Sequence, residues 1–171
     1  MTTALFFLVW GLATALALPL LLPFHARGIE GVRAFTVANA LAVLSLLAYA
    51  SADLVPPSLY VMVSNAAWLA AMSLVYVGVR QFFGLRPHAR RAAVAAAVGI
   101  LAMALMLYAT DNLVGRMTLF SGYTCVLMGA TGRVVYRQRQ RIQTPGVMLY
   151  VMLSMFGLAA LSALRAVVYG S

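Results

Sequence analysis

The chain has 171 residues, of which 64% are apolar and only 9% charged, and its formal net charge is +9. Soluble domains average about 45–50% apolar and about 25% charged residues, so this composition excludes an ordinary water-soluble protein. The 12 basic residues are all arginines in or near short loops between apolar runs. That placement indicates orientation in a membrane rather than nucleic-acid binding. We therefore predict an all-α, polytopic transmembrane helix bundle with no soluble domain, in contact with the lipid bilayer.

The apolar runs divide the chain into successive predicted spans. A helix needs about 20 apolar residues to cross the hydrocarbon core. The sequence predicts about six spans, over residues 4–24, 34–52, 57–83, 92–109, 113–136 and 147–169. The first run is too long for a signal peptide, and no basic residue precedes it. Pro57 suits the first turn of the third span.

Arginine counts predict the orientation of these spans. Loops one, three and five and the helix ends beside them hold 10 arginines, whereas the other side holds only Arg116 and Arg165. Positively charged loops stay in the cytoplasm. We therefore expect the Arg-rich loops one, three and five to be cytoplasmic and the N-terminus to lie outside.

Two amides, Asn39 and Asn65, lie inside apolar runs. An unpaired amide in hydrocarbon is costly, so both are expected to face other helices. We favour a role in helix pairing, with a ligand site or proton path as the alternative. The segments around them, 37–40 and 63–66, also echo each other.

Four charged residues lie on the predicted outer side: Asp53, Asp111, Arg116 and Arg165. Charges near the ends of spans usually pair or extend toward the headgroups. We favour local pairing. The alternative is an outward-facing pocket in which the arginines receive an anion from an unknown small ligand.

Small residues recur at four-residue spacing in spans four to six, as in Ala92 and Ala96 or Ser121, Cys125 and Gly129. Such faces let helices approach closely. Packing within the chain is the favoured interpretation, and a homodimer through span five or six is the alternative.

The inventory of reactive residues predicts no enzyme. The chain holds three acidic residues and two histidines, His25 and His88, and it has no HExxH, CxxC or phosphate-binding glycine loop. We accordingly expect no metal and no cofactor.

Residues 31–84 carry a resemblance to a known family. They contain GVRAFTVANAL, a break at 53–57, VSNAA and YVGVRQFFG. This resembles the membrane-embedded N-terminal region of bacterial GGDEF-type diguanylate cyclases, as does Arg165 in an L-R-A setting. The resemblance implies a sensory or anchoring module of the bacterial inner membrane. In that family the module regulates a C-terminal cytoplasmic cyclase that makes cyclic di-GMP from two GTP.

The chain departs from a whole cyclase because it contains no GGDEF motif. By the arginine count it also ends on the outer side. We therefore expect either the input region of a longer protein or a stand-alone relative. A small multi-span transporter and a structural membrane anchor are the alternatives.

Overall fold

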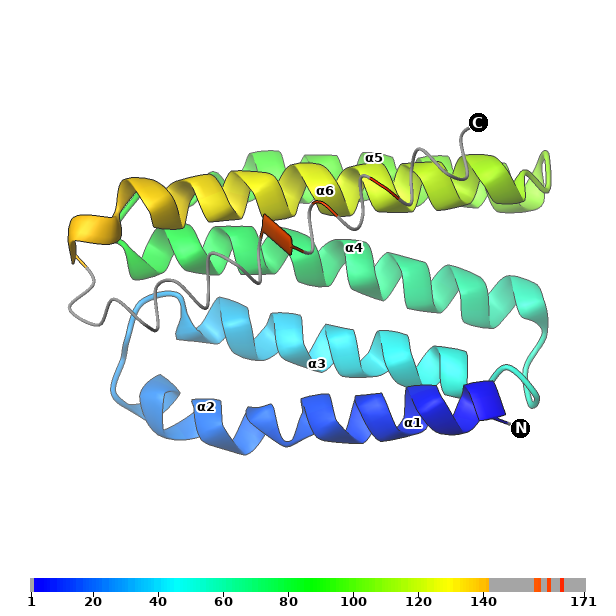
Figure 1. Cartoon of the computed structure of the whole chain (residues 1–171), viewed down its shortest axis with the longest axis horizontal. Coiled ribbons are helices and arrows are strands. Elements are labelled where there is room, and N and C mark those ends of the chain that lie inside the picture. The colour runs from blue at the N-terminus through cyan, green and yellow to red at the C-terminus, as the bar shows by residue number, and fades with distance from the viewer. Residues whose placement is uncertain (1, 142–155, 158–159, 161–163, 165–171) are drawn as a thin grey trace.

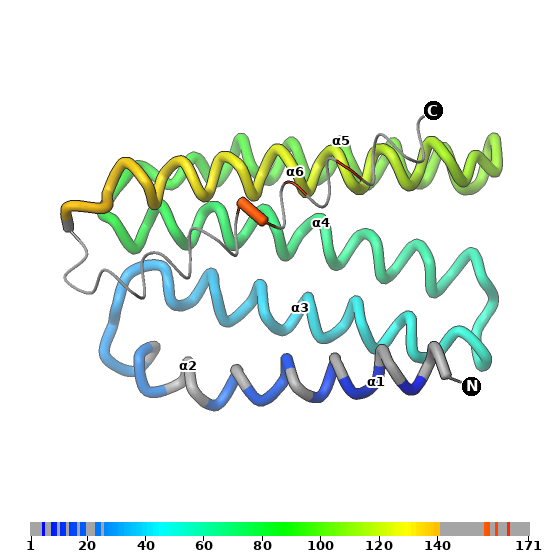
Figure 2. Tube along the Cα trace, viewed as in Figure 1, coloured from blue at the N-terminus to red at the C-terminus, as the bar shows by residue number. Residues whose placement is uncertain are grey.

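The chain folds into a bundle of helices that lie side by side along one axis (Figure 1). This computed structural model describes residues 2–141, Phe156, Gly157, Ala160 and Leu164. Helix α2 continues in the direction of α1, and from α2 to α6 successive helices run in opposite directions, so the loops between them alternate between the two ends of the bundle (Figure 2). The described helices are α1 (Thr2–Ala15), α2 (Ala17–Ala26), α3 (Val32–Ala50), α4 (Pro57–Phe82), α5 (Ala89–Tyr108) and α6 (Leu113–Arg137), followed by the short 3-10 helix η1 (Arg139–Arg141).

The prediction of about six spans is wrong. In the part of the chain that the structure describes, three helices are long and apolar enough to cross a membrane: α3, α4 and α5. Those three helices indicate a membrane protein, and their apolar surfaces are compatible with contact with a bilayer. The expectation that the N-terminus lies outside rested on the six-span count and falls with it.

Proline explains the loss of the predicted span over 4–24. Pro19 has no N–H to donate to the carbonyl of Ala15, and its ring crowds that carbonyl. The helix is interrupted at Leu16, which leaves α1 with 14 residues and α2 with 10. Neither piece reaches the length of about 20 residues that a span requires.

The predicted spans over 113–136 and 147–169 are also absent from the three candidate membrane helices, for other reasons. Helix α6 has 25 residues, but it is the least apolar of the six α-helices because glycines, hydroxyl residues and arginines interrupt it. The predicted span over 147–169 lies outside the described residues, except for Phe156, Gly157, Ala160 and Leu164.

Helix α4 is the centre of the bundle. It contacts α3, α5 and α6, while α1 and α2 pack against α3. In its most apolar stretch, 50% of the residues are buried inside the bundle. Leu69 is fully buried, and Ala71 and Met72 pack with Met128 of α6. By contrast, α3 and α5 leave large apolar side chains such as Leu44 and Leu101 exposed, as a lipid-facing surface requires.

Glycine ends α4 in a Schellman motif. The N–H of Leu85 donates to the carbonyl of Arg80, and the N–H of Gly84 donates to the carbonyl of Gln81, both at 2.8 Å. Gly84 has φ 66°, a left-handed conformation that glycine adopts at little cost. Asn112 caps the beginning of α6, because its side-chain oxygen accepts a hydrogen bond from the N–H of Gly115 at 2.7 Å.

The loop before α3 crosses α4 with no room for a side chain. Gly31 has φ 85°, and a Cβ built on it would press against the carbonyl oxygen of Gly78. Gly78 is also buried, and a Cβ there would meet the ring of Phe35 at 3.1 Å. These two glycines set how closely α3 and α4 approach at this end.

Replacement of Gly31 tests this close approach. Gly31→Ala is expected to lower the free energy of unfolding by about 3 kcal/mol, because it adds steric displacement to a left-handed backbone cost. Gly28 (φ 68°) has open space around its Cβ position. Gly28→Ala is therefore the matched control, with an expected loss of about 1 kcal/mol. Thermal unfolding in detergent measures the loss of stability in both variants. Equal losses would contradict the close contact between Gly31 and Gly78.

Candidate ligand-binding site

A cavity of about 590 Å³ lies between α3, α4 and α6, near the end of the bundle that carries the α3–α4 and α5–α6 loops. Its volume is within the range of small-molecule sites. Its lining is mostly apolar with a few polar groups, as such sites usually are. The lining residues that matter for its chemistry are Tyr49, Tyr60, Asn65, Trp68, Arg116 and Phe120.

Paired aromatic rings form much of the cavity wall. Tyr49 and Tyr60 meet edge to face with ring centroids 6.1 Å apart. Trp68 and Phe120 stack at the same centroid distance, with an interplanar angle of 26°. The indole N–H of Trp68 also donates to the hydroxyl of Thr124 at 3.4 Å. These contacts hold the rings of α3, α4 and α6 in fixed orientations.

Asn65 connects α4 to α3 within the cavity. The Tyr49 hydroxyl donates to the Asn65 side-chain oxygen at 3.1 Å. Ser64, the residue before Asn65, shares a hydrogen bond of 3.0 Å with the hydroxyl of Ser45 of α3. Asn65 therefore pairs two helices and also presents a polar group to the cavity.

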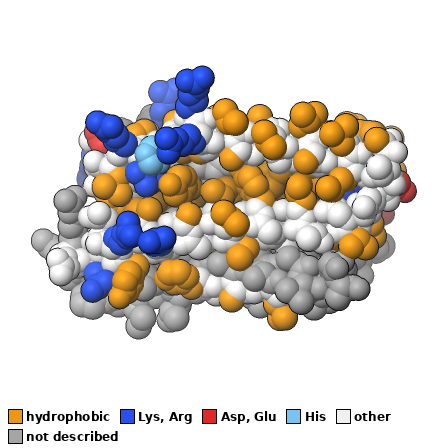
Figure 3. All heavy atoms as spheres, turned by 90° about the horizontal axis from the view of Figure 1, so that it is seen from above, with side chains coloured by type: hydrophobic (Ala, Val, Ile, Leu, Met, Phe, Trp, Pro, Cys, Tyr) orange, Lys and Arg blue, Asp and Glu red, His pale blue; other side chains and the backbone are white. Residues whose placement is uncertain are grey.

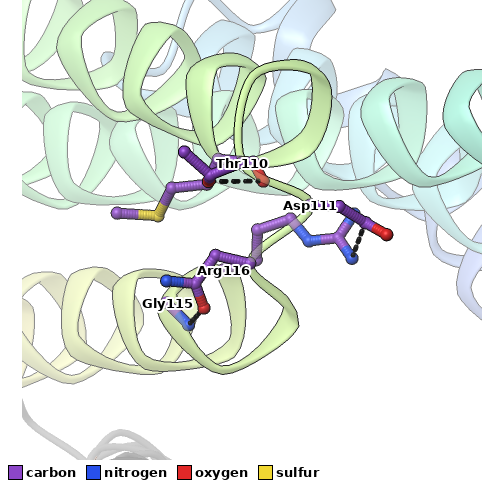
Figure 4. A network of polar contacts seen from close by, with 6 residues as sticks. Thr110, Asp111, Gly115 and Arg116 are labelled. Atoms are coloured by element: carbon purple, nitrogen blue, oxygen red, sulfur yellow. Dashed lines mark hydrogen bonds and ion pairs between the residues drawn. The ribbon is translucent and has the colours of Figure 1, made fainter.

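Arg116 is a nearly buried cation whose positive charge is only partly balanced by the neighbouring carboxylate. Its side chain is only 11% exposed, and its Nη2 lies 3.5 Å from Asp111 Oδ1 (Figure 4). Asp111 is 88% exposed, so water screens this pair strongly. The Arg116 Nε is buried and has no hydrogen-bond partner among the described residues. A desolvated guanidinium with an unused donor is costly, and such a group is expected to have a function.

The structure brings some of the predicted site residues together and separates others. Asn65 and Arg116 line the same cavity, and Asp111 lies at its edge through its ion pair with Arg116. Asn39 lies elsewhere, because its amide donates to the carbonyl of Thr14 at 3.0 Å and ties α3 to α1. Asp53 is exposed in the α3–α4 loop. Arg165 lies outside the described residues.

Sequence reasoning missed the aromatic wall. None of the four rings, those of Tyr49, Tyr60, Trp68 and Phe120, was among the candidate site residues. A signal was present, because Trp68 follows Asn65 by one helical turn and Phe120 follows Arg116 by one turn. Residues three or four apart share a helix face, so each polar candidate already had an aromatic neighbour.

The small-residue face of α5 packs inside the chain. Ala92, Ala96 and Gly99 are buried. A Cβ on Gly99 would be in contact with Leu69 of α4 and Tyr123 of α6, at 3.4 and 3.5 Å. On α6, Ser121 and Gly132 are buried as well. A homodimer through span five or six stays a prediction.

The opposite end of the bundle is strongly basic. Arginine side chains gather at one end of the face in Figure 3, and hydrophobic side chains extend over the rest of that face. His88 lies in this region, in the left-handed conformation just before α5. The positive charge of Arg80 lowers the pKa of His88 most strongly, followed by loss of hydration, Arg91 and Arg86. This pKa shift indicates a positive electrostatic potential around the α4–α5 loop.

Compared with known proteins, the chain matches no protein-family model, no curated protein and no solved structure. The resemblance of residues 31–84 to cyclase membrane regions therefore rests on the sequence alone. Within the described residues, no group of three or more His, Cys, Asp or Glu side chains is arranged to hold a metal ion.

A double-mutant cycle tests the hydrogen bond between Tyr49 and Asn65. We expect Tyr49→Phe and Asn65→Leu each to destabilise the protein, with a coupling energy of about 0.6 kcal/mol because both remove the same bond. Reversible unfolding in detergent gives the four free energies. Asn39→Leu, which removes a bond to a different helix, should show no coupling to Tyr49→Phe. Additive effects of Tyr49→Phe and Asn65→Leu would show that the bond does not form.

The His88 pKa predicts an acid-sensitive contribution to stability. The unfolded chain binds this proton more readily than the folded chain, because the folded-state pKa lies below the ordinary value of 6.5. Stability should therefore fall as the pH drops below about 6.5. Arg80→Gln should raise the pKa of His88 in an NMR titration, whereas the more distant Arg139→Gln should not. An unchanged pKa in Arg80→Gln would contradict the electrostatic cause.

Proposed function

We propose that this chain is a membrane-embedded signal-input module that binds a small lipophilic anion in the cavity between α3, α4 and α6. The observation that carries the proposal is Arg116, a nearly buried cation at an apolar cavity with a buried Nε that has no partner in the described part of the chain. An anionic group on a ligand would compensate this charge better than the exposed Asp111 does.

The cavity lining supports this class of ligand. Four aromatic side chains offer apolar surface to a hydrocarbon or ring system, and one guanidinium offers a site for its charge. Because the Arg116 Nε is enclosed in the present structure, pairing with a ligand would require the guanidinium to turn from Asp111 toward the cavity. The 3.5 Å contact with an exposed carboxylate makes such a turn inexpensive.

The position of the cavity supports a signalling role. A ligand that contacts α3, α4 and α6 favours the arrangement of these helices that fits it best. Helix α4 also contacts α5, and the C-terminal end of α4 lies at the basic end of the bundle. We propose that this basic end faces the cytoplasm of a bacterial cell, as the arginine distribution favours. The resemblance of residues 31–84 suggests a diguanylate cyclase as the output that the module regulates.

Two other functions make different demands on the same structure. A structural anchor requires the packing around α4 but no occupied cavity. A transporter requires a site near the middle of the membrane that opens to each side in turn. The cavity near one end of the bundle, with a charge at its edge, favours ligand sensing over both.

Thermal stability with decanoate as the probe tests the proposal. In an uncharged detergent, saturating decanoate is expected to raise Tm, by about 2–4 °C for each kcal/mol of binding free energy. Decanol, which has the same chain without the charge, should have a much smaller effect. Arg116→Gln should abolish the difference between the two probes. Arg139→Gln, an exposed arginine at the other end of the bundle, should retain it.

Two results would contradict the proposal. Equal effects of decanoate and decanol would show that Arg116 does not recognise an anion. A decanoate effect of the same size in Arg116→Gln would place binding outside this cavity. Either result would favour the anchor.

A further inference from the structure

A second hollow in the surface lies at the basic end of the bundle. A groove of about 580 Å³ runs between the α2–α3 loop and the α4–α5 loop. It is far from the aromatic cavity along α4, because its α4 residue is Gln81 whereas the cavity contains Tyr60 and Trp68. The charged residues that line it are Glu30, Arg33 and Arg86.

The walls of this groove are held by a backbone contact on one side and by an arginine side chain on the other. Gly31 packs directly against Gly78 of α4, which fixes the α2–α3 loop. The Arg80 Nε donates to the carbonyl oxygen of Arg86 at 2.6 Å, which fixes the α4–α5 loop across from it. Gly84 completes the turn in a left-handed conformation. The groove is therefore a preformed feature.

The charge of the groove favours an anion. Arg33 and Arg86 line the groove, and neither arginine forms an ion pair with another described residue. The ion pair between Asp111 and Arg116 lies at the other end of the bundle. Glu30 is the one acidic residue in the lining, and it is exposed. The positive charges of Arg80, Arg91 and Arg86 also lower the pKa of His88, together with loss of hydration, in keeping with the basic character of this end.

The surroundings of the groove favour an amphiphilic anion. Ile29 lines the groove and is 38% exposed, and Phe82, beside the lining residue Gln81, is 56% exposed. The groove lies at the ends of α3 and α4, two helices that are long and apolar enough to cross a membrane. Groups at the ends of such helices lie at the depth of lipid headgroups, and basic pockets between helices there suit anionic headgroups.

We propose that this groove binds the phosphodiester headgroup of an anionic phospholipid, with Arg33 and Arg86 on the phosphate and the acyl chains beside Ile29 and Phe82. A free phosphate offers the same charge without the chains, so the experiment must separate the two sources. The site does not depend on ligand binding in the aromatic cavity.

The test uses the full chain in an uncharged detergent, with Tm measured during titration with dihexanoyl phosphatidylglycerol. We expect saturable stabilisation by this lipid. Dihexanoyl phosphatidylcholine, which carries no net charge, and inorganic phosphate should stabilise much less at the same concentration. Arg33→Gln and Arg86→Gln should each weaken the apparent affinity about fivefold, which is the contribution of one arginine near an anionic lipid. Glu30→Gln should strengthen it.

Arg139→Gln is the matched control, because Arg139 lies at the same end but outside the groove, over the ring of Tyr136. An equal loss of affinity in Arg139→Gln would show a diffuse basic surface and overturn the site. Equal stabilisation by inorganic phosphate would overturn the lipid as the ligand. Equal stabilisation by phosphatidylcholine would show that charge does not select the lipid. The Tm of each variant without lipid shows whether it is folded.

Discussion

The burial of α4 is the constraint on which the rest of the structure depends. A helix in a bilayer gains little from leaving lipid for protein, so helix association relies on close packing and on hydrogen bonds between helices. Helix α4 uses both. Small residues such as Ala67, Ala71 and Gly78 let its neighbours approach, and Ser64 and Asn65 bond to α3. Both proposed sites lie along this helix, one toward each end.

The two ends of the bundle differ in how their charges are placed. At the basic end, arginines surround a loop that glycine turns hold in place. At the other end, Arg116 is withdrawn from water and faces an aromatic cavity, with the exposed carboxylate of Asp111 as its ion-pair partner. An exposed arginine contributes mainly to orientation at the membrane surface. A buried arginine must be compensated, and this difference is why Arg116 rather than the arginine-rich loops is the centre of the proposed ligand site.

The sequence predicted an all-helical membrane protein, and its turns at Pro57, Gly84 and Asn112 carry readable end signals. It failed on the number of spans, because hydropathy does not register that Pro19 breaks the first run into two short helices. Asn65 and Arg116 were identified as candidates, since a polar group in an apolar run stands out. Their meeting in one cavity was not predictable, because it depends on how α3, α4 and α6 rotate about their axes. The rings around them were missed because aromatic residues suit a headgroup belt and a cavity wall equally well.

Labelling of single cysteines in intact cells tests most directly the claim that α3, α4 and α5 carry the chain across the membrane. In a Cys125→Ser background, Asp53→Cys and Thr110→Cys report one end of the bundle, and Ala89→Cys reports the basic end. All three positions are exposed. A membrane-impermeant maleimide should label the first two cysteines in intact cells and should label the third only after the cells are opened. Labelling of all three in intact cells, or of none, would contradict a bundle that crosses the membrane with its basic end inside.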